Sequence, residues 1–183
     1  MKPIELYTTP EGDVTLREMG EAERQLKETD TEFIQKMLST LNDFYPQAHE
    51  ALMQIYSKSA LNKSYRDYLA VRRFIKCNFG VYDNAVDIDQ NFNFKFEFVS
   101  CPLRGECKWD GVLCQPQFNS QLSTRQAEVM KLCYRGMKDE QIADMLSMSL
   151  NTLLNHKKAA YRKLGIHSMS EFIRYASEHH LYD

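Results

Sequence analysis

The sequence predicts a mainly α-helical protein with a small β and cysteine-rich segment in its middle. Three observations support this fold class. Apolar residues recur at helical spacing over residues 30–75 and again over 123–178. Phenylalanine alternates with polar residues over 91–99, which is typical of a half-buried strand. Several cysteines then follow over 101–114. We therefore expect an N-terminal helical bundle, a small β/cysteine-rich segment with a candidate zinc site, and a C-terminal four-helix domain.

Composition limits the class of protein. With 183 residues and a net charge of −2, the chain is expected to hold one or two domains. It contains no apolar run long enough to span a membrane and does not begin with a secretory signal pattern, so we expect a cytoplasmic location. Five cysteines in such a protein argue against structural disulfides. Because no nucleophile–base pair, phosphate-binding loop or paired carboxylates stand out, an enzyme is not expected.

The first part of the chain is predicted to be a flexible tail at 1–15 followed by a helical domain at 16–76. Residues 16–26 favour a first helix, which Gly20 weakens. The apolar stripe of the next helix is clearer, and it is formed by Phe33, Ile34, Met37, Leu38 and Leu41. Three firmer helices are expected, from Asp30 to Phe44, from Pro46 through Tyr56, and from Ser64 to Ile75.

The segment at 77–116 is expected to form a polar turn, the strand at 91–99 and a metal site. Thiolates are soft ligands, and four of them suit tetrahedral zinc. Gly105 and Gly111 would let the loops turn so that the sulfurs converge. The spacing lacks the C-x2-C pair of zinc knuckles, so three interpretations stay open: structural zinc, which is favoured, ordinary reduced cysteines, and an iron–sulfur or redox-sensing site. The candidate ligands are Cys77, Cys101, Cys107 and Cys114.

A polar linker at 115–121 leads into the C-terminal domain at 120–183. Ser123 and Gln126 have the spacing of a capping box, and Gly136 is expected to end the first helix in a left-handed conformation. A turn at Ser147 and Met148 separates the next two helices, which gives a helix-turn-helix. The remaining helices are expected at 138–146, 150–164 and 169–178, the last with Ser168 and Glu171 as its capping box.

The predicted helix at 150–164 has a polar and basic face that suits a DNA groove. Amides near its start can read base edges, and cations further along can hold phosphates. The charge is local, because residues from 120 onward carry nine Lys/Arg and seven Asp/Glu, whereas the rest of the chain carries 14 and 18. The residues expected on this outer face are Asn151, Leu154, Asn155, Lys157, Lys158, Tyr161 and Arg162.

An ordered set of residues from 122 to 165 resembles the DNA-binding domain of LuxR/FixJ/NarL-type bacterial transcription regulators. The set comprises Leu122, Ser123, Arg125, Glu128, Val129, Leu132, Gly136, Ile142, Ala143, Leu146, Ser149, Thr152, His156, Lys163, Leu164 and Gly165. The resemblance implies that Leu154, Asn155 and Lys158 read bases, and that Thr152, His156, Lys157 and Arg162 lie nearer the DNA backbone. Leu154 stands where this family usually has a lysine, and a leucine can contact a thymine methyl but cannot donate a hydrogen bond.

These observations predict a sequence-specific DNA-binding transcription regulator. Double-stranded DNA is the expected partner, and RNA polymerase is a further candidate. Because the positive charge of one copy is modest, a homodimer on paired half-sites is expected. Two alternatives stay open. One is a small sigma-factor-like protein of transcription initiation. The other is a metal or redox sensor, or an adaptor, with a degenerate helix-turn-helix, which the unusual Leu154 favours.

Overall fold

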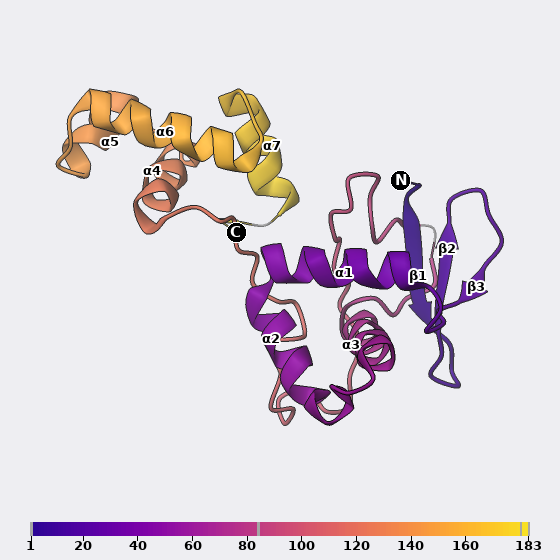
Figure 1. Ribbon diagram of the computed structural model, residues 1–183. Helices are drawn as coiled ribbons and strands as arrows, with labels where there is room; N and C mark the ends of the chain where they lie inside the picture. The colour runs from indigo at the N-terminus through magenta and orange to yellow at the C-terminus, as the bar shows by residue number, and fades with distance from the viewer. Residues whose placement is uncertain (1, 84, 180, 183) are drawn as a thin grey trace. The chain divides into compact units, whose positions relative to one another are not determined.

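The computed structural model describes residues 2–83, 85–179 and 181–182, and it divides into two compact units (Figure 1). The first unit is Met1–Gln117 and the second is Phe118–Asp183. The boundary lies within the polar stretch 115–121. The described residues form seven α-helices and one three-stranded sheet, so the protein is mainly helical as predicted. None of the described helices has both the length and the apolar character needed to cross a membrane.

The N-terminal residues form an antiparallel sheet, and the predicted flexible tail at 1–15 and helix at 16–26 are wrong. The sheet has the order β1-β2-β3, with strands β1 (Ile4–Thr8), β2 (Val14–Glu18) and β3 (Arg24–Gln25). Alternate apolar side chains explain the strands, since Ile4, Leu6, Val14 and Leu16 are each at most 2% exposed. Gly12, with a φ of +86°, allows the tight turn between β1 and β2.

Three α-helices belong to the same unit, and α3 packs against this sheet (Figure 1). They are α1 (Thr31–Phe44), α2 (Pro46–Ile55) and α3 (Lys63–Asn78), with the short helix η1 (Ser57–Ser59) between the last two. The apolar stripe predicted for α1 is buried at every position. Pro46 occupies the first turn of α2 as expected, because that position needs no N–H donor. Helix α3 contacts both β1 and β2, which joins helices and sheet around one core.

The strand predicted at 91–99 does not form. Only isolated bridges occur there, from Ile88 to Ile4 and to Phe94. Phe92 has a φ of +66°, outside the range of extended strands, so the alternating rings do not share one face. Phe94 is buried and packs against Phe74 of α3, whereas Phe98 is 69% exposed. The segment therefore belongs to the same unit as the helices, not to a separate strand and cysteine domain.

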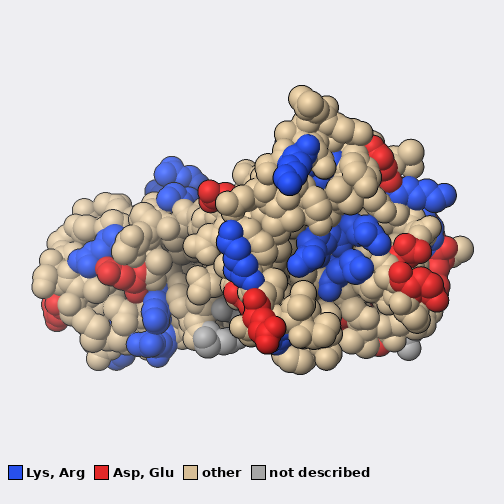
Figure 2. Space-filling model, turned by 90° about the horizontal axis from the view of Figure 1, so that it is seen from below, with Lys and Arg blue, Asp and Glu red and all other residues tan. Residues whose placement is uncertain are grey.

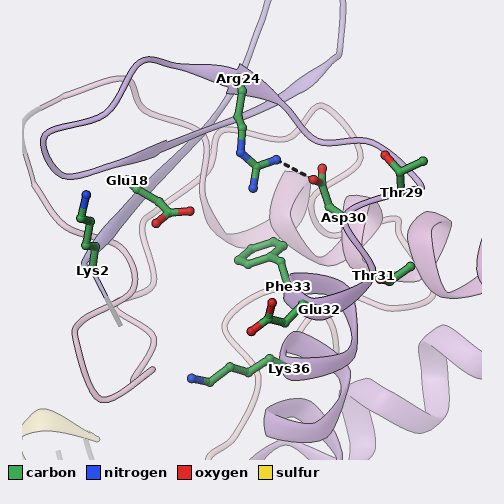
Figure 3. A pocket seen from close by; sticks show the side chains of 9 residues that line it. All are labelled: Lys2, Glu18, Arg24, Thr29, Asp30, Thr31, Glu32, Phe33 and Lys36. Carbon is green, nitrogen blue, oxygen red and sulfur yellow. Dashed lines mark hydrogen bonds and ion pairs between the residues drawn. The ribbon is translucent and has the colours of Figure 1, made fainter.

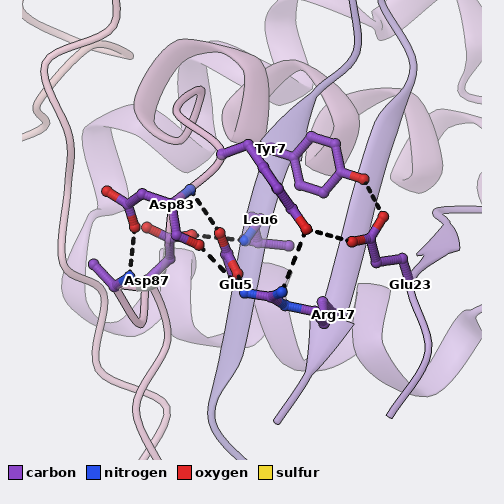
Figure 4. Close-up of polar contacts among 9 residues, drawn as sticks. Glu5, Leu6, Tyr7, Arg17, Glu23, Asp83 and Asp87 are labelled. Carbon is purple, nitrogen blue, oxygen red and sulfur yellow. Dashed lines mark hydrogen bonds and ion pairs between the residues drawn. The ribbon is translucent and has the colours of Figure 1, made fainter. Parts of the chain in front are cut away.

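Polar contacts attach the loop before this segment to β1 (Figure 4). Glu5 is 1% exposed, forms an ion pair with Arg17 of β2, and accepts a 2.8 Å hydrogen bond from the backbone N–H of Asp83. The Tyr7 and Tyr82 hydroxyls donate to the two carboxylate oxygens of Glu23, at 2.7 and 2.6 Å. These polar contacts lie on the outer face of the sheet, while helix α3 packs against β1 and β2.

The second unit contains four helices that match the prediction closely (Figure 1). They are α4 (Thr124–Tyr134), α5 (Asp139–Met145), α6 (Leu150–Leu164) and α7 (Met169–Glu178). The capping box of Ser123 and Gln126 is present, and Gly136 has the expected positive φ of +77°. The second predicted capping box is only half formed. Ser168 accepts from the Glu171 N–H, but the Glu171 carboxylate accepts from the backbone of His167.

Candidate nucleic-acid interface

Helix α6 is held by a compact support formed by α4 and α5. Its buried side, with Leu153 and Ala160 both 0% exposed, packs into the two apolar clusters of the second unit. The Ser149 hydroxyl caps its first turn by accepting a hydrogen bond of 3.1 Å from the Thr152 N–H. The Arg125 guanidinium of α4 donates to the carbonyl oxygen of Leu146, which fixes the turn between α5 and α6. The opposite side of α6 is therefore presented on a rigid base.

Most residues predicted for the outer face of α6 are exposed. The exposed set consists of Asn151, Thr152, Leu154, Asn155, Lys158 and Arg162, and His156 is half-buried. The Thr152 hydroxyl lies 2.8 Å from that of Ser149, so it is held at the start of the helix. Helix α6 contains no acidic residue, so its exposed cations face outward without a carboxylate on the same helix. The roles of these residues in DNA binding stay predictions.

Two of the predicted residues are not placed as expected. Lys157 donates to both carboxylate oxygens of Asp139 in α5, at 2.7 and 3.0 Å, and its side chain is only 19% exposed. Burial is the largest single effect and lowers the pKa of Lys157, but the hydrogen bond to Asp139 and the nearby Cys133, Asp139 and Tyr161 together outweigh it, so the pKa is raised overall. Tyr161 is half-buried, and its hydroxyl donates to the sulfur of Met169 at 3.6 Å. Both side chains thus help to hold the helices together.

A shallow groove runs along α6 and the turn that follows it. Gly165, with a φ of +66°, reverses the chain so that the next residues return to the side of the helix. His167 is exposed at the edge of this groove and was not among the predicted site residues. His167 follows Gly165 by two residues, and a glycine that ends a helix is the sequence feature that could have indicated its position. The groove is lined by Leu154, Lys157, Lys158, Tyr161, Arg162, Gly165, Ile166 and His167.

The basic charge is spread over both units rather than confined to α6. In α6 the exposed cations are Lys158, Arg162 and Lys163, and the last also donates to the carbonyl of Gln121 at 3.2 Å. Figure 2 shows further groups of adjoining Lys and Arg side chains, with acidic side chains interspersed among them. The net charge of −2 therefore conceals local positive surfaces.

The four candidate zinc ligands are reduced cysteines near the end of α3 and in the loop at 101–114. Cys114 is buried, and Cys77, Cys101 and Cys107 are half-buried. Burial raises the pKa of Cys77 and raises that of Cys114 to about 11. Within the described part of the chain, no group of three or more His, Cys, Asp or Glu residues is arranged to hold a metal ion. The zinc site stays a prediction.

A second pocket lies in the first unit, beside the start of α1 (Figure 3). Three cations and three carboxylates line it together with Phe33, and Arg24 crosses it to bond Asp30 at 2.7 Å. Because the two signs of charge balance, the lining does not select a charged ligand. The charged residues are Lys2, Arg24, Lys36, Glu18, Asp30 and Glu32.

The sequence that forms α4 to α7 also matches a known protein family. Residues 120–176 match the model of the luxR family of bacterial regulatory proteins, named GerE. These residues form a LuxR-family helix-turn-helix domain. The match covers the four-helix unit that carries α6, so the resemblance seen in the sequence is confirmed for the C-terminal third of the chain.

Curated relatives share the same part of the chain. The Fimbriae Z protein of Salmonella typhimurium strain LT2 is 40% identical over 60 residues, which is 33% of this chain and 29% of the relative. That of Escherichia coli K12 is 38% identical with the same coverage. The HTH-type transcriptional regulator MalT of Yersinia pestis Pestoides F is 30% identical over 95 residues, 49% of this chain and 10% of the relative. The chain thus spans less than a third of these relatives, and no solved structure matches it.

Proposed function

We propose that this protein is a transcription regulator that binds double-stranded DNA and reads its major groove with α6. The observation that carries the proposal is the exposed side of α6 within a LuxR-family domain. This side has amides in its first two turns, exposed cations in its last turns and no carboxylate along its length. The major groove of B-form DNA is wide enough to admit an α-helix.

The chemistry of the face assigns a role to each end of the helix. Asn155 is exposed, and its amide can form the paired hydrogen bonds that an adenine edge offers. Lys158 and Arg162 lie three and seven residues further along, on the same side of the helix, where their charges can reach phosphates. Leu154 is 46% exposed and apolar, so it is suited to a thymine methyl group. Lys157 stays bound to Asp139 and supports the helix from the side.

Few cations are available to one copy, and this favours a dimer. The exposed cations of α6 are Lys158, Arg162 and Lys163. Each phosphate neutralised contributes about −0.9 to the slope of log affinity against log salt concentration, so one copy is expected to give a slope of about −3 or shallower. Such binding is weak at physiological salt. Two copies on half-sites about one helical turn apart would combine their contacts, and we infer a homodimer on DNA.

The test is an unbiased selection of DNA sequences bound by the full chain, followed by affinity measurements across a salt series. We expect a two-fold symmetric or repeated motif. Lys158→Ala should weaken binding and reduce the magnitude of the salt slope by about 0.9 for each copy bound. The matched control is Lys131→Ala, which removes an exposed cation from α4 in the same unit and should leave the slope unchanged.

Loss of a base contact and loss of a phosphate contact should have different effects on DNA binding. Asn155→Ala should lower discrimination between the selected motif and unrelated DNA, because a base contact is lost. Uniform weakening of all sequences by Lys158→Ala makes it a phosphate contact, whereas lost discrimination makes it a base contact. The proposal is wrong if no motif is selected and if Lys158→Ala and Lys131→Ala bind DNA alike.

A further inference from the structure

Helix α3 concentrates positive charge in a unit that is acidic overall. The first unit carries 14 Lys/Arg and 18 Asp/Glu. The 16 residues of α3 include Lys63, Arg66 and three further cations, but Asp67 is the helix's one acidic residue. Asp67 is 1% exposed and is shared between Lys63 at 2.7 Å and Arg66 at 2.8 Å. The charges of the other three cations are therefore not balanced within the helix. They are Arg72, Arg73 and Lys76.

These three cations lie on the side of α3 that is opposite to its core contacts. The buried residues of the helix are Asp67, Ala70, Val71, Phe74, Ile75 and Asn78. At 3.6 residues per turn, Arg72, Arg73 and Lys76 project from the other side, and so does Tyr65, which is 43% exposed. We call Tyr65, Arg72, Arg73 and Lys76 the basic face of α3. It extends along about 16 Å of the helix.

The two ends of α3 are both anchored, so the basic face is held in place. At the start, the Asn62 side chain caps the helix by accepting a hydrogen bond of 3.2 Å from the Tyr65 N–H. At the end, the amide nitrogen of the buried Asn78 donates to the carbonyl of Leu113 at 2.8 Å, and its amide oxygen accepts from the N–H of Gln115 at 2.8 Å. A partner that binds this face does not have to order the helix first.

The turn between β1 and β2 orients two of the cations without neutralising them. Arg72 donates to the carbonyl of Gly12 at 2.7 Å, and Lys76 donates to the same oxygen at 3.1 Å. A carbonyl oxygen accepts hydrogen bonds but has no net charge, so two positive charges remain side by side. The Asp13 carboxylate is 49% exposed and lies 3.8 Å from Arg72, and an exposed pair of this kind is weak. The face therefore suits an anionic partner.

We propose that the basic face of α3 binds the phosphate backbone of double-stranded DNA next to the sequence read by α6. This inference rests on the proposed function, because both units would bind the same DNA. Arginine, lysine and tyrosine side chains are common donors to phosphate oxygens, and the planar guanidinium group can form two parallel bonds to one phosphate. DNA carries one negative charge for about every 1.7 Å of its axis, so a face about 16 Å long can meet more than one phosphate.

The contacts of α3 would add to those of α6 without changing the sequence that is read. The slope of about −3 for one copy counts the cations of α6 alone, and two phosphates neutralised by Arg72 and Lys76 would add about −1.8. Between 50 and 200 mM salt, this addition corresponds to about a twelvefold further loss of affinity. Phosphates are the same in every sequence, so the selected motif should not depend on α3.

The affinity of the full chain for two duplexes tests the proposal. One duplex holds the selected motif alone, and the other extends it on each side by about 15 base pairs, or one and a half turns. Arg72→Gln/Lys76→Gln removes both charges but keeps a donor for the carbonyl of Gly12. On the longer duplex, this variant should reduce the magnitude of the salt slope by about 1.8 for each copy bound. On the motif alone, it should bind like the unaltered chain.

Lys27→Gln/Lys95→Gln is the matched control, because it removes two exposed cations of the first unit that lie outside α3. It should leave both salt slopes unchanged, and urea unfolding shows whether each variant is folded. If the α3 variant keeps the full slope on the longer duplex while Lys158→Ala still weakens binding, the proposal for α3 is overturned and that for α6 stands. If neither variant affects binding, both proposals are wrong. Normal DNA binding by the α3 variant with loss of binding to polyglutamate would assign the face to an acidic protein and would also overturn the proposal.

Discussion

Asp87 makes the stability of the first unit depend on pH in an unusual direction. Asp87 is 2% exposed and lies beside β1, where its carboxylate accepts a hydrogen bond of 2.6 Å from the N–H of Leu6 (Figure 4). Burial is the main cause that raises the pKa of Asp87 to about 7, the Leu6 N–H opposes it, and the negative charges of Glu97, Glu5 and Asp83 raise it further. Arg17 pairs with Glu5 and leaves Asp87 without a cation of its own among its hydrogen-bond partners.

The direction of the pH dependence follows from whether the folded or the unfolded protein keeps Asp87 protonated. Between pH 3.8 and about 7 the folded protein keeps Asp87 protonated, whereas the unfolded chain has it ionised. The folded state then binds more protons, so this contribution to stability is complete below pH 3.8 and is lost as pH rises through about 7. A shift of about three pKa units corresponds to about 4 kcal/mol in the free energy of unfolding.

Asp87→Asn should remove this dependence. The amide keeps an oxygen for the Leu6 N–H and cannot ionise, so at pH 8 the variant should be more stable than the unaltered chain by up to about 4 kcal/mol. At pH 5 the difference should be much smaller. Urea unfolding followed by the fluorescence of Trp109 measures this, because the single tryptophan lies in the first unit.

A second variant in the first unit provides the control for Asp87→Asn. Asp43→Asn is the control, because it removes an exposed carboxylate from α1 by the same chemical change. Glu23 and Asp67 have lowered pKa values, so their contributions are lost as pH falls, but they are present in all three proteins and cancel in the difference. If the gap between Asp87→Asn and the unaltered chain is the same at pH 5 and pH 8, the reasoning is refuted.

Two further predictions concern the second unit. Leu153→Ala should lower the free energy of unfolding by about 2–5 kcal/mol, because it leaves a cavity between α4, α5 and α6. Leu154→Ala should lower it little, because Leu154 is exposed. Unfolding followed by circular dichroism measures both, and equal losses would contradict the packing described. Lys157→Met should lower stability by about 1 kcal/mol or less and leave the salt slope of DNA binding unchanged, since its partner is Asp139. A shallower slope would make Lys157 a phosphate contact.

The second unit is predictable from its sequence because its signals are local. Ser123, Ser149 and Ser168 cap the helices that follow them, and Gly136 and Gly165 end helices with positive φ. Each signal acts within a few residues of the position it marks. The partner of Lys157 could not be predicted in the same way. Helical spacing places this lysine on one side of α6, but Asp139 lies 18 residues earlier and meets it only through packing.

The first unit was harder to predict because its sheet depends on pairing between distant residues. The apolar alternation of Ile4 and Leu6 is short, and it forms a strand only opposite Val14 and Leu16. The alternating phenylalanines at 92–98 gave a misleading signal. They alternate as a strand would, but the positive φ of Phe92 turns the chain. The rings of Phe94 and Phe96 pack around Tyr45 and Phe74 instead of lying along one sheet face.

The bonds of Asn78 also affect how the protein can change during evolution. Its contacts with the backbone at 113 and 115 join the two ends of a long irregular excursion at its base. The entropy lost on closing a loop grows only with the logarithm of its length, about 0.6 kcal/mol for each doubling. Insertions in exposed parts of this loop, such as the turn around Leu103, would therefore cost little stability and leave the end of α3 in place. Relatives of this protein are expected to vary in length there while keeping an asparagine at the base.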